Sequence, residues 1–106
     1  MAVRVEYHQQ AVRQLGSIAR GDKASARAIA DAIDNLANEP QPHGCETLDE
    51  SLYRIRVRDY RVIYGLNKRE KRVVVLKIAR RSEATYQGMK KLAGRFKRMR
   101  AKSEDK

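Results

Sequence analysis

Apolar and charged side chains alternate along residues 53–58, and this alternation constrains the fold more than any other feature of the sequence. The apolar positions are Tyr53, Ile55 and Val57, and the positions between and after them are Arg54, Arg56 and Arg58. Because successive side chains of a β-strand point to opposite faces of its sheet, the arginine face must stay open when the apolar face is buried. Like charges on one face repel one another, and an anion between them would offset that cost. The arginine face is therefore either an ordinary solvated sheet face or an anion-binding surface.

Two further strand patterns follow directly along the chain. Residues 60–66 alternate apolar with other side chains, residues 67–72 form a polar turn, and residues 73–79 are almost continuously apolar. Three neighbouring strands joined by short turns predict an antiparallel meander. The basic residues of these strands that we expect to converge on the arginine face are Arg61, Arg80 and Arg81.

The direction of Arg80 is open at this point. Arg80 has the same parity as the apolar Leu76 and Ile78, whereas Lys77 has the opposite parity. Either the strand ends or bulges before Arg80, which frees its direction, or Lys77 takes the place on the basic face.

The first half of the chain predicts a strand and two helices. Residues 3–7 alternate apolar and charged side chains, which indicates a short strand. Apolar residues three and four apart then predict a helix that ends at Gly21. Asp22 is suited to cap a second, alanine-rich helix, which must stop before Pro40 because proline cannot continue it. Two helices joined by this short turn form a hairpin that can cover one face of a sheet.

The remaining segments complete the expected fold. Residues 39–51 are polar and irregular, and residues 83–100 return to helical spacing. We predict an α+β domain over residues 1–100, with an N-terminal strand, a helical hairpin packed on an antiparallel sheet of about four strands, and a C-terminal helix. Residues 101–106 have no apolar anchor and are expected to form a disordered tail.

Charge is concentrated in the second half of the chain. The 106 residues carry a formal net charge of +11. Residues 51–106 hold nineteen basic and five acidic side chains, a net charge of +14, while residues 1–50 have a net charge of −3. This asymmetry favours a polyanionic partner over a merely soluble surface. No segment approaches the length of a membrane-spanning helix, and we expect a cytoplasmic protein.

The residue types limit the available chemistry. A single cysteine cannot form a disulfide within the chain, and one cysteine with two histidines is too few for a zinc finger. Scattered carboxylates argue against a two-metal nuclease, so we expect no metal or cofactor.

RNA cleavage without metal requires no protein nucleophile, because the 2′-hydroxyl can attack the adjacent phosphate while arginines stabilise the added charge. Tyr86 is a candidate proton carrier or base-stacking platform, although a lone tyrosine more often packs on the core. We interpret His43 and Cys45 as loop residues, with a nucleophilic role as the lesser alternative.

The motifs YRIRVRDYRVIY (residues 53–64) and VVVLKIARR (residues 73–81), followed by Tyr86, resemble the RelE/ParE toxin superfamily of type II toxin–antitoxin systems, and its RelE branch in particular. This resemblance covers almost the whole chain. It implies a ribosome-dependent endoribonuclease that cuts messenger RNA in the ribosomal A site, against 16S rRNA, and that is held by a cognate antitoxin in a hetero-oligomer.

The resemblance also implies roles for individual residues. Arg61 falls on the phosphate-binding arginine of the RelE branch, Arg80 on its transition-state arginine, and Tyr86 on the tyrosine that orients the nucleotide or transfers a proton. Arg54 and Arg56 fall where that branch often has lysines, and arginine keeps the charge but weakens acid–base chemistry. The residues expected to contact RNA around this set are Arg58, Lys77, Arg81 and Lys90.

Two other functions stay open. A ParE-like inhibitor of DNA gyrase would use the basic face for protein contact, and a non-catalytic ribosome- or RNA-binding module would result if arginine at the lysine positions removed catalysis. The C-terminal apolar stripe has two interpretations as well: it packs on the sheet of its own domain, or its docking groove receives an antitoxin helix. The residues of this stripe are Met89, Leu92, Phe96 and Met99.

Overall fold

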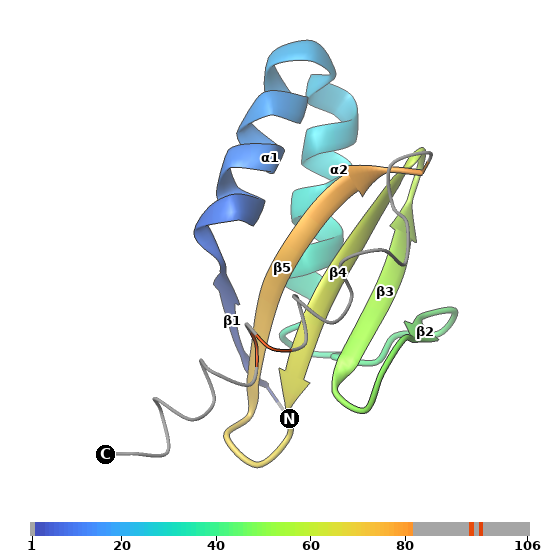
Figure 1. Ribbon diagram of the computed structural model, residues 1–106. Coiled ribbons are helices and arrows are strands. Elements are labelled where there is room, and N and C mark those ends of the chain that lie inside the picture. Colours follow the sequence, from blue (N-terminus) through green and yellow to red (C-terminus); the bar gives the residue numbers. More distant parts are fainter. Residues whose placement is uncertain (1, 82–93, 95, 97–106) are drawn as a thin grey trace.

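The computed structural model describes residues 2–81 together with Gly94 and Phe96 (Figure 1). The elements in chain order are β1 (Arg4–Tyr7), α1 (Gln9–Gly21), α2 (Lys23–Asn35), β2 (Glu46–Thr47), β3 (Leu52–Val57), β4 (Tyr60–Asn67) and β5 (Arg72–Arg80). Gly94 and Phe96 are helical. The rest of the predicted C-terminal helix, the end of the predicted domain at residue 100 and the predicted tail lie outside the described residues. No helix within the described part of the chain is long and apolar enough to cross a membrane.

The strands form one five-stranded sheet in the order β1-β5-β4-β3-β2. Strands β3, β4 and β5 make the predicted antiparallel meander. The sheet is mixed, because β1 runs parallel to β5, with Val5 opposite Val73. The fifth strand, β2, was not predicted: its two residues lie in the segment expected to be irregular and pair with β3. A two-residue strand carries no readable alternation, and the direction of β1 depends on a partner that is distant in sequence.

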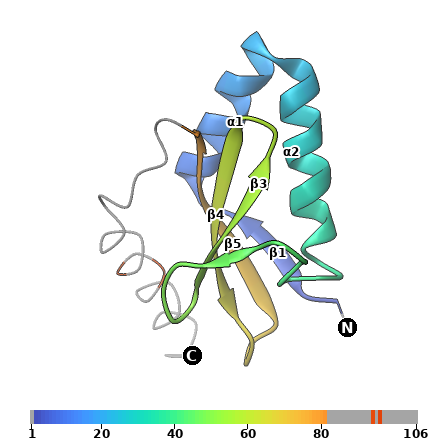
Figure 2. The same cartoon turned by 90° about the vertical axis from the view of Figure 1, so that its right-hand side faces the viewer.

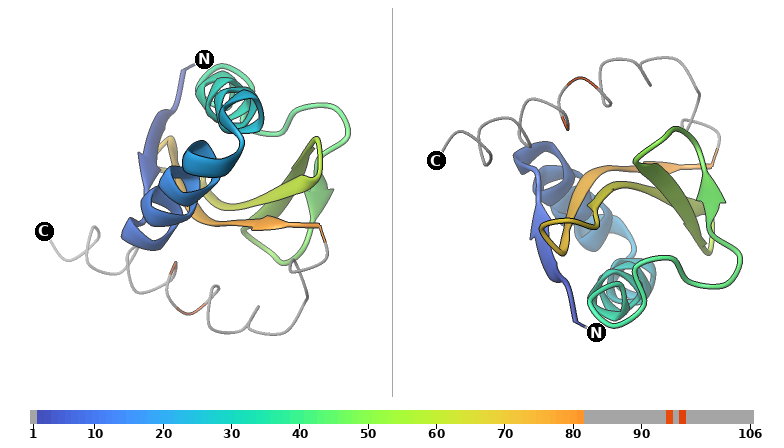
Figure 3. Two further views of the ribbon diagram at one scale, coloured as in Figure 1. Left: turned by 90° about the horizontal axis from the view of Figure 1, so that it is seen from above. Right: turned by 90° about the horizontal axis from the view of Figure 1, so that it is seen from below.

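Both helices pack on one face of the sheet, as expected (Figures 2 and 3). Asp22 caps α2 by accepting a hydrogen bond from the backbone N–H of Ser25 at 3.1 Å, which confirms the predicted cap. Buried residues of the helices, including Ile29 and Ile33, pack against Tyr53, Val62 and other residues of the strands. The α+β fold with an N-terminal strand and a helical hairpin is therefore as the sequence predicts.

The opposite face of the sheet is only partly open. It carries a second apolar cluster, consisting of Leu52, Ile63, Val74, Leu76 and Phe96. Phe96 is 1% exposed and packs directly over Gly65, where the absence of a side chain leaves room for its ring. The arginine face thus extends over one end of the sheet, next to an apolar strip covered by Phe96.

The contact between Gly65 and Phe96 predicts that alanine at position 65 destabilises the protein. A Cβ atom on residue 65 would come 2.5 Å from the Phe96 ring. We expect Gly65→Ala to lower the free energy of unfolding by about 1–3 kcal/mol, because a buried ring has little space to move. Urea denaturation measures this effect.

The matched control is Gly16→Ala in α1, where a Cβ meets nothing within 4 Å. This change should raise the free energy of unfolding by about 0.5–1 kcal/mol, since alanine is the better helix former. In a Phe96→Ala background the Gly65→Ala penalty should disappear. A penalty that persists there would show that the ring is not its cause.

Candidate functional site

A β-bulge in β5 decides which cations share a face. The register of β4 and β5 shifts by one residue, so that Ile63 lies opposite Lys77 but Tyr64 lies opposite Val75. The extra residue is Leu76, which joins the cluster under Phe96. Beyond the bulge, Lys77 shares the face of Ile63, whereas Arg80 lies opposite Tyr60 on the helix side. The strand thus bulges before Arg80, as one alternative had it, but the bulge turns Arg80 to the helix side, and Lys77 is the one that lies opposite Ile63.

Three arginines at the open end of the sheet lie close enough to Arg61 for their charges to act on it, and we call the four together the arginine cluster: Arg54, Arg56, Arg61 and Arg81. Arg56 and Arg61 are direct neighbours across β3 and β4. The backbone N–H of Arg81 donates to the Asp59 carbonyl at 2.7 Å, which ties the end of β5 to the β3–β4 turn. Partial burial, followed by the charges of Arg56, Arg54 and Arg81, lowers the pKa of Arg61. Arg61 nevertheless remains charged, because an arginine does not lose its proton at physiological pH.

Glu46 is part of this site and was not predicted from the sequence. Its carboxylate accepts a hydrogen bond from Arg54 and another, at 3.4 Å, from Arg56. The pairing of β2 with β3 places Glu46 directly opposite Arg54. The preceding segment is held in turn by Tyr64, whose hydroxyl donates to the Pro40 carbonyl at 2.7 Å. No local pattern could have revealed Glu46, because its role depends on a two-residue strand.

The two ion pairs leave Arg54 and Arg56 in different environments. The side chain of Arg54 is 12% exposed and that of Arg56 is 66% exposed. Arg54 is therefore largely enclosed beside the Glu46 carboxylate, while Arg56 reaches into solvent. Of the two, Arg56 offers the accessible guanidinium.

Arg80 does not join the arginine cluster, and the expected convergence of Arg80 with Arg61 is corrected. The guanidinium of Arg80 lies over the ring of Tyr60, 5.8 Å from its centre. It lines a cavity of about 360 Å³ between α1 and the end of β5, which Asp22 also lines. The physical reason is the bulge. Its extra residue places Ile78 on the helix side of the sheet, and Arg80, two residues further on, lies on that same side.

The other candidate residues lie in several places. Arg58 is exposed at the β3–β4 turn with a φ of 55°, close enough to Asp22 for its charge to help lower the pKa of that carboxyl, after the hydrogen bonds from Ser25. Lys77 is half-buried and also lines the cavity beside Arg80. Tyr86 and Lys90 lie outside the described residues.

His43 and Cys45 form no reactive pair in the structure. His43 is exposed, whereas Cys45 is half-buried against the helix-side core. Cys45 lies beside Tyr64, whose pKa is raised mainly by burial and further by the Cys45 thiol. Among residues 2–81, Gly94 and Phe96, no group of three or more histidine, cysteine, aspartate and glutamate side chains is arranged to hold a metal ion.

Residues 5–85 match the protein family described as the ParE toxin of the type II toxin–antitoxin system parDE. The fold also matches solved toxin structures. The archaeal RelE of the RelE–RelB complex from Pyrococcus horikoshii OT3 is 35% identical, with a TM-score of 0.66 over 79% of this chain and 100% of that one. A search of curated protein sequences gives no significant match.

More distant sequences share the same fold. A double mutant of the Escherichia coli toxin RelE in the free state is 17% identical, with a TM-score of 0.66 over 80% of this chain and 88% of that one. A YoeB/ParE toxin from Agrobacterium tumefaciens is also 17% identical, with a TM-score of 0.64 over 73% of this chain and 96% of that one. The chain belongs to the ParE toxin family of type II toxin–antitoxin systems, within the RelE/ParE superfamily, as its motifs suggested.

The position of Glu46 predicts how this site responds to loss of the carboxylate. Glu46→Gln removes the negative charge beside Arg54 and Arg56, so the protein should bind heparin more tightly and elute from it at higher salt. Glu50→Gln makes the same change of charge at an exposed loop residue and serves as the control. Equal shifts in elution for both variants would mean that only net charge matters.

Proposed function

We propose that this protein is a toxin of the RelE-like branch, which cleaves messenger RNA on the ribosome without a metal ion. The observation that carries the proposal is the arginine cluster, in which arginines from β3, β4 and the end of β5 lie near one another and two of them pair with one carboxylate. A solvated sheet face would not need an ionic network of this kind. A phosphodiester is the ligand that best matches several adjacent guanidinium groups.

The proposed chemistry follows from what arginines do well. Arg56, Arg61 and Arg81 bind the scissile phosphate and orient it so that the 2′-hydroxyl attacks in line with the leaving oxygen. In this arrangement the guanidinium groups also stabilise the extra negative charge that the phosphate gains in the transition state. Arg81 takes the transition-state role that the resemblance alone would give to Arg80, because the charge of Arg81 acts on Arg61.

Glu46 supplies what the arginines lack. A guanidinium is a poor proton acceptor, whereas a carboxylate can accept the proton of the attacking 2′-hydroxyl. We assign this general-base role to Glu46, with Arg54 as the positioning residue that holds its carboxylate in place. Tyr86 remains our candidate for orienting the nucleotide or returning a proton to the leaving oxygen.

The comparisons support an antitoxin partner. The relative from Pyrococcus horikoshii is described as part of a RelE–RelB complex, and the Escherichia coli RelBE toxin–antitoxin complex has the same fold, with a TM-score of 0.60. We propose that this protein is likewise held by a cognate antitoxin in the cytoplasm. Its charge of +11 favours ribosomal RNA as the surface on which it acts.

A second candidate function has an observation in its favour. The matching family is described by the ParE toxin, and a ParE-like member would inhibit DNA gyrase. In that case the arginine cluster would contact protein rather than phosphate. A non-catalytic RNA-binding module is the third candidate, since Arg54 and Arg56 replace the lysines that are common in the RelE branch.

Mapping the 5′ ends of messenger RNA after brief induction tests the proposal. We expect wild-type protein to arrest growth and to generate new 5′ ends within translated regions. Arg61→Ala and Arg81→Ala should each relieve the arrest and reduce cleavage by about 100-fold or more, a loss comparable to that of one transition-state donor. Arg80→Ala, a cation on the other side of the sheet, should retain cleavage.

Each alternative has its own outcome. Intact messenger RNA together with a DNA-damage response would support gyrase inhibition. Ribosome binding without new 5′ ends would support the non-catalytic module. Loss of cleavage in Arg80→Ala but not in Arg81→Ala would contradict the assignment of Arg81.

The role of Glu46 predicts a separation of binding from catalysis. Glu46→Gln should lower the cleavage rate by about 100-fold or more, because general-base catalysis contributes factors of this size. Binding of a 2′-O-methyl RNA, which cannot be cut through its 2′-hydroxyl, should not weaken. A cleavage rate close to that of wild type would exclude Glu46 as the base.

A further inference from the structure

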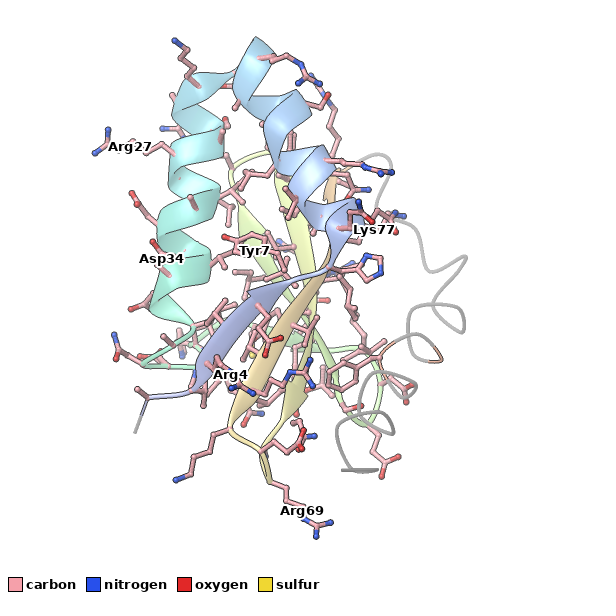
Figure 4. All side chains as sticks on the ribbon, turned by 90° about the vertical axis from the view of Figure 1, so that its left-hand side faces the viewer. Arg4, Tyr7, Arg27, Asp34, Arg69 and Lys77 are labelled. Atoms are coloured by element: carbon pink, nitrogen blue, oxygen red, sulfur yellow. The ribbon has the colours of Figure 1, made fainter. Side chains whose placement is uncertain are left out.

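A second group of cations lies at the far end of the sheet. The turn between β4 and β5 carries three exposed basic residues, which we call the hairpin tip: Lys68, Arg69 and Lys71. Arg69 projects beyond the end of the sheet (Figure 4). None of the three makes an ion pair with the described residues.

The turn holds its single acid inward. Asn67, itself buried, accepts a hydrogen bond from the Glu70 backbone N–H and donates one to the Glu70 carboxylate, both at 3.1 Å. The Glu70 carboxylate also lies 3.9 Å from the guanidinium of Arg72. Glu70 is therefore engaged with the base of the turn, and the three cations of the hairpin tip point outward on an ordered backbone.

The hairpin tip is too far from the arginine cluster to act on the same phosphate. Arg61 lies near the start of β4 and Lys68 just beyond its end, so at about 3.4 Å per residue they are roughly 24 Å apart. This separation is about three times the screening length of about 8 Å at physiological salt. Between the two groups, the sheet face is apolar and covered by Phe96.

The chemistry of the hairpin tip fits backbone phosphates. A protein interface normally has an apolar or aromatic centre, and residues 68–71 contain neither. Three cations without a stacking side chain match the regular phosphates of a nucleic acid and carry no means of reading its bases. The surface is thus suited to sequence-independent contact with a folded RNA.

We propose that the hairpin tip binds the backbone phosphates of a structured RNA segment, separate from the strand that the arginine cluster cleaves. The inference deepens the proposed function and rests on it, because it takes RNA as the partner. The two contacts together would hold the toxin at one position on a large RNA surface.

Salt dependence of RNA binding tests the proposal with the full chain. The probe is a 2′-O-methyl RNA duplex of about 20 base pairs, long enough to span both groups of cations. The test variant is Lys68→Gln/Arg69→Gln/Lys71→Asn, in which asparagine suits the φ of 52° at residue 71. The control is Arg13→Gln/Lys23→Gln/Arg27→Gln, three exposed cations of the helical hairpin with the same total charge.

A plot of log affinity against log salt concentration has a negative slope. We expect the test variant to reduce the magnitude of this slope by about 2–3, since each lost phosphate contact removes nearly one unit. The control should keep the wild-type slope. Arg69→Gln alone, at a side chain that projects into solvent, should reduce the magnitude of the slope by about one and tests the proposal even if the triple variant does not fold.

Two results would overturn the inference. Equal slopes for the test and control variants would mean that the hairpin tip contributes only net charge. If the test variant lost as much affinity for polyglutamate as for RNA, the hairpin tip would recognise the carboxylates of a protein as well as it recognises phosphates. Failure of the proposed function is distinguishable, because a wild-type protein that cuts no RNA can still show the change of slope in the test variant.

Discussion

Repulsion between guanidinium groups is the constraint on which the site depends. Arg56 and Arg61 are direct neighbours across two paired strands, an arrangement that destabilises a sheet unless something compensates the charge. Glu46 compensates part of it by bonding to both Arg54 and Arg56, and its charge acts more weakly on Arg61. Within the described residues, the open end of the sheet is therefore only partly neutralised.

The two faces of the sheet differ in what they carry. The helix side supplies a continuous apolar core, and the opposite side is shared between the arginine cluster and the apolar strip under Phe96. Gly65 makes this second packing possible, since any side chain there would collide with the ring.

The basic side chains that the structure describes in the second half of the chain lie on separate surfaces. The β3–β4 turn, beside the arginine cluster, and the β4–β5 turn, which carries the hairpin tip, lie at opposite ends of β4. Arg80 belongs to neither group, as it faces Tyr60 beside the helical hairpin. Among the described residues, the positive charge is thus spread over two ends of the sheet, which suits contact with an extended polyanion at more than one point.

The sequence by itself determined the strands and helices other than β2, the Asp22 cap and the presence of a basic sheet face, because alternation and capping are local patterns. Only the tertiary structure decided that Arg80 leaves the site, that Arg81 stays and that Glu46 joins it. The reason in the first case is a single extra residue, Leu76, which reverses the parity of every side chain before it relative to those after it. In the last case it is a pairing between β2 and β3, whose contact depends on how the connection from α2 folds back and not on any periodicity in the chain.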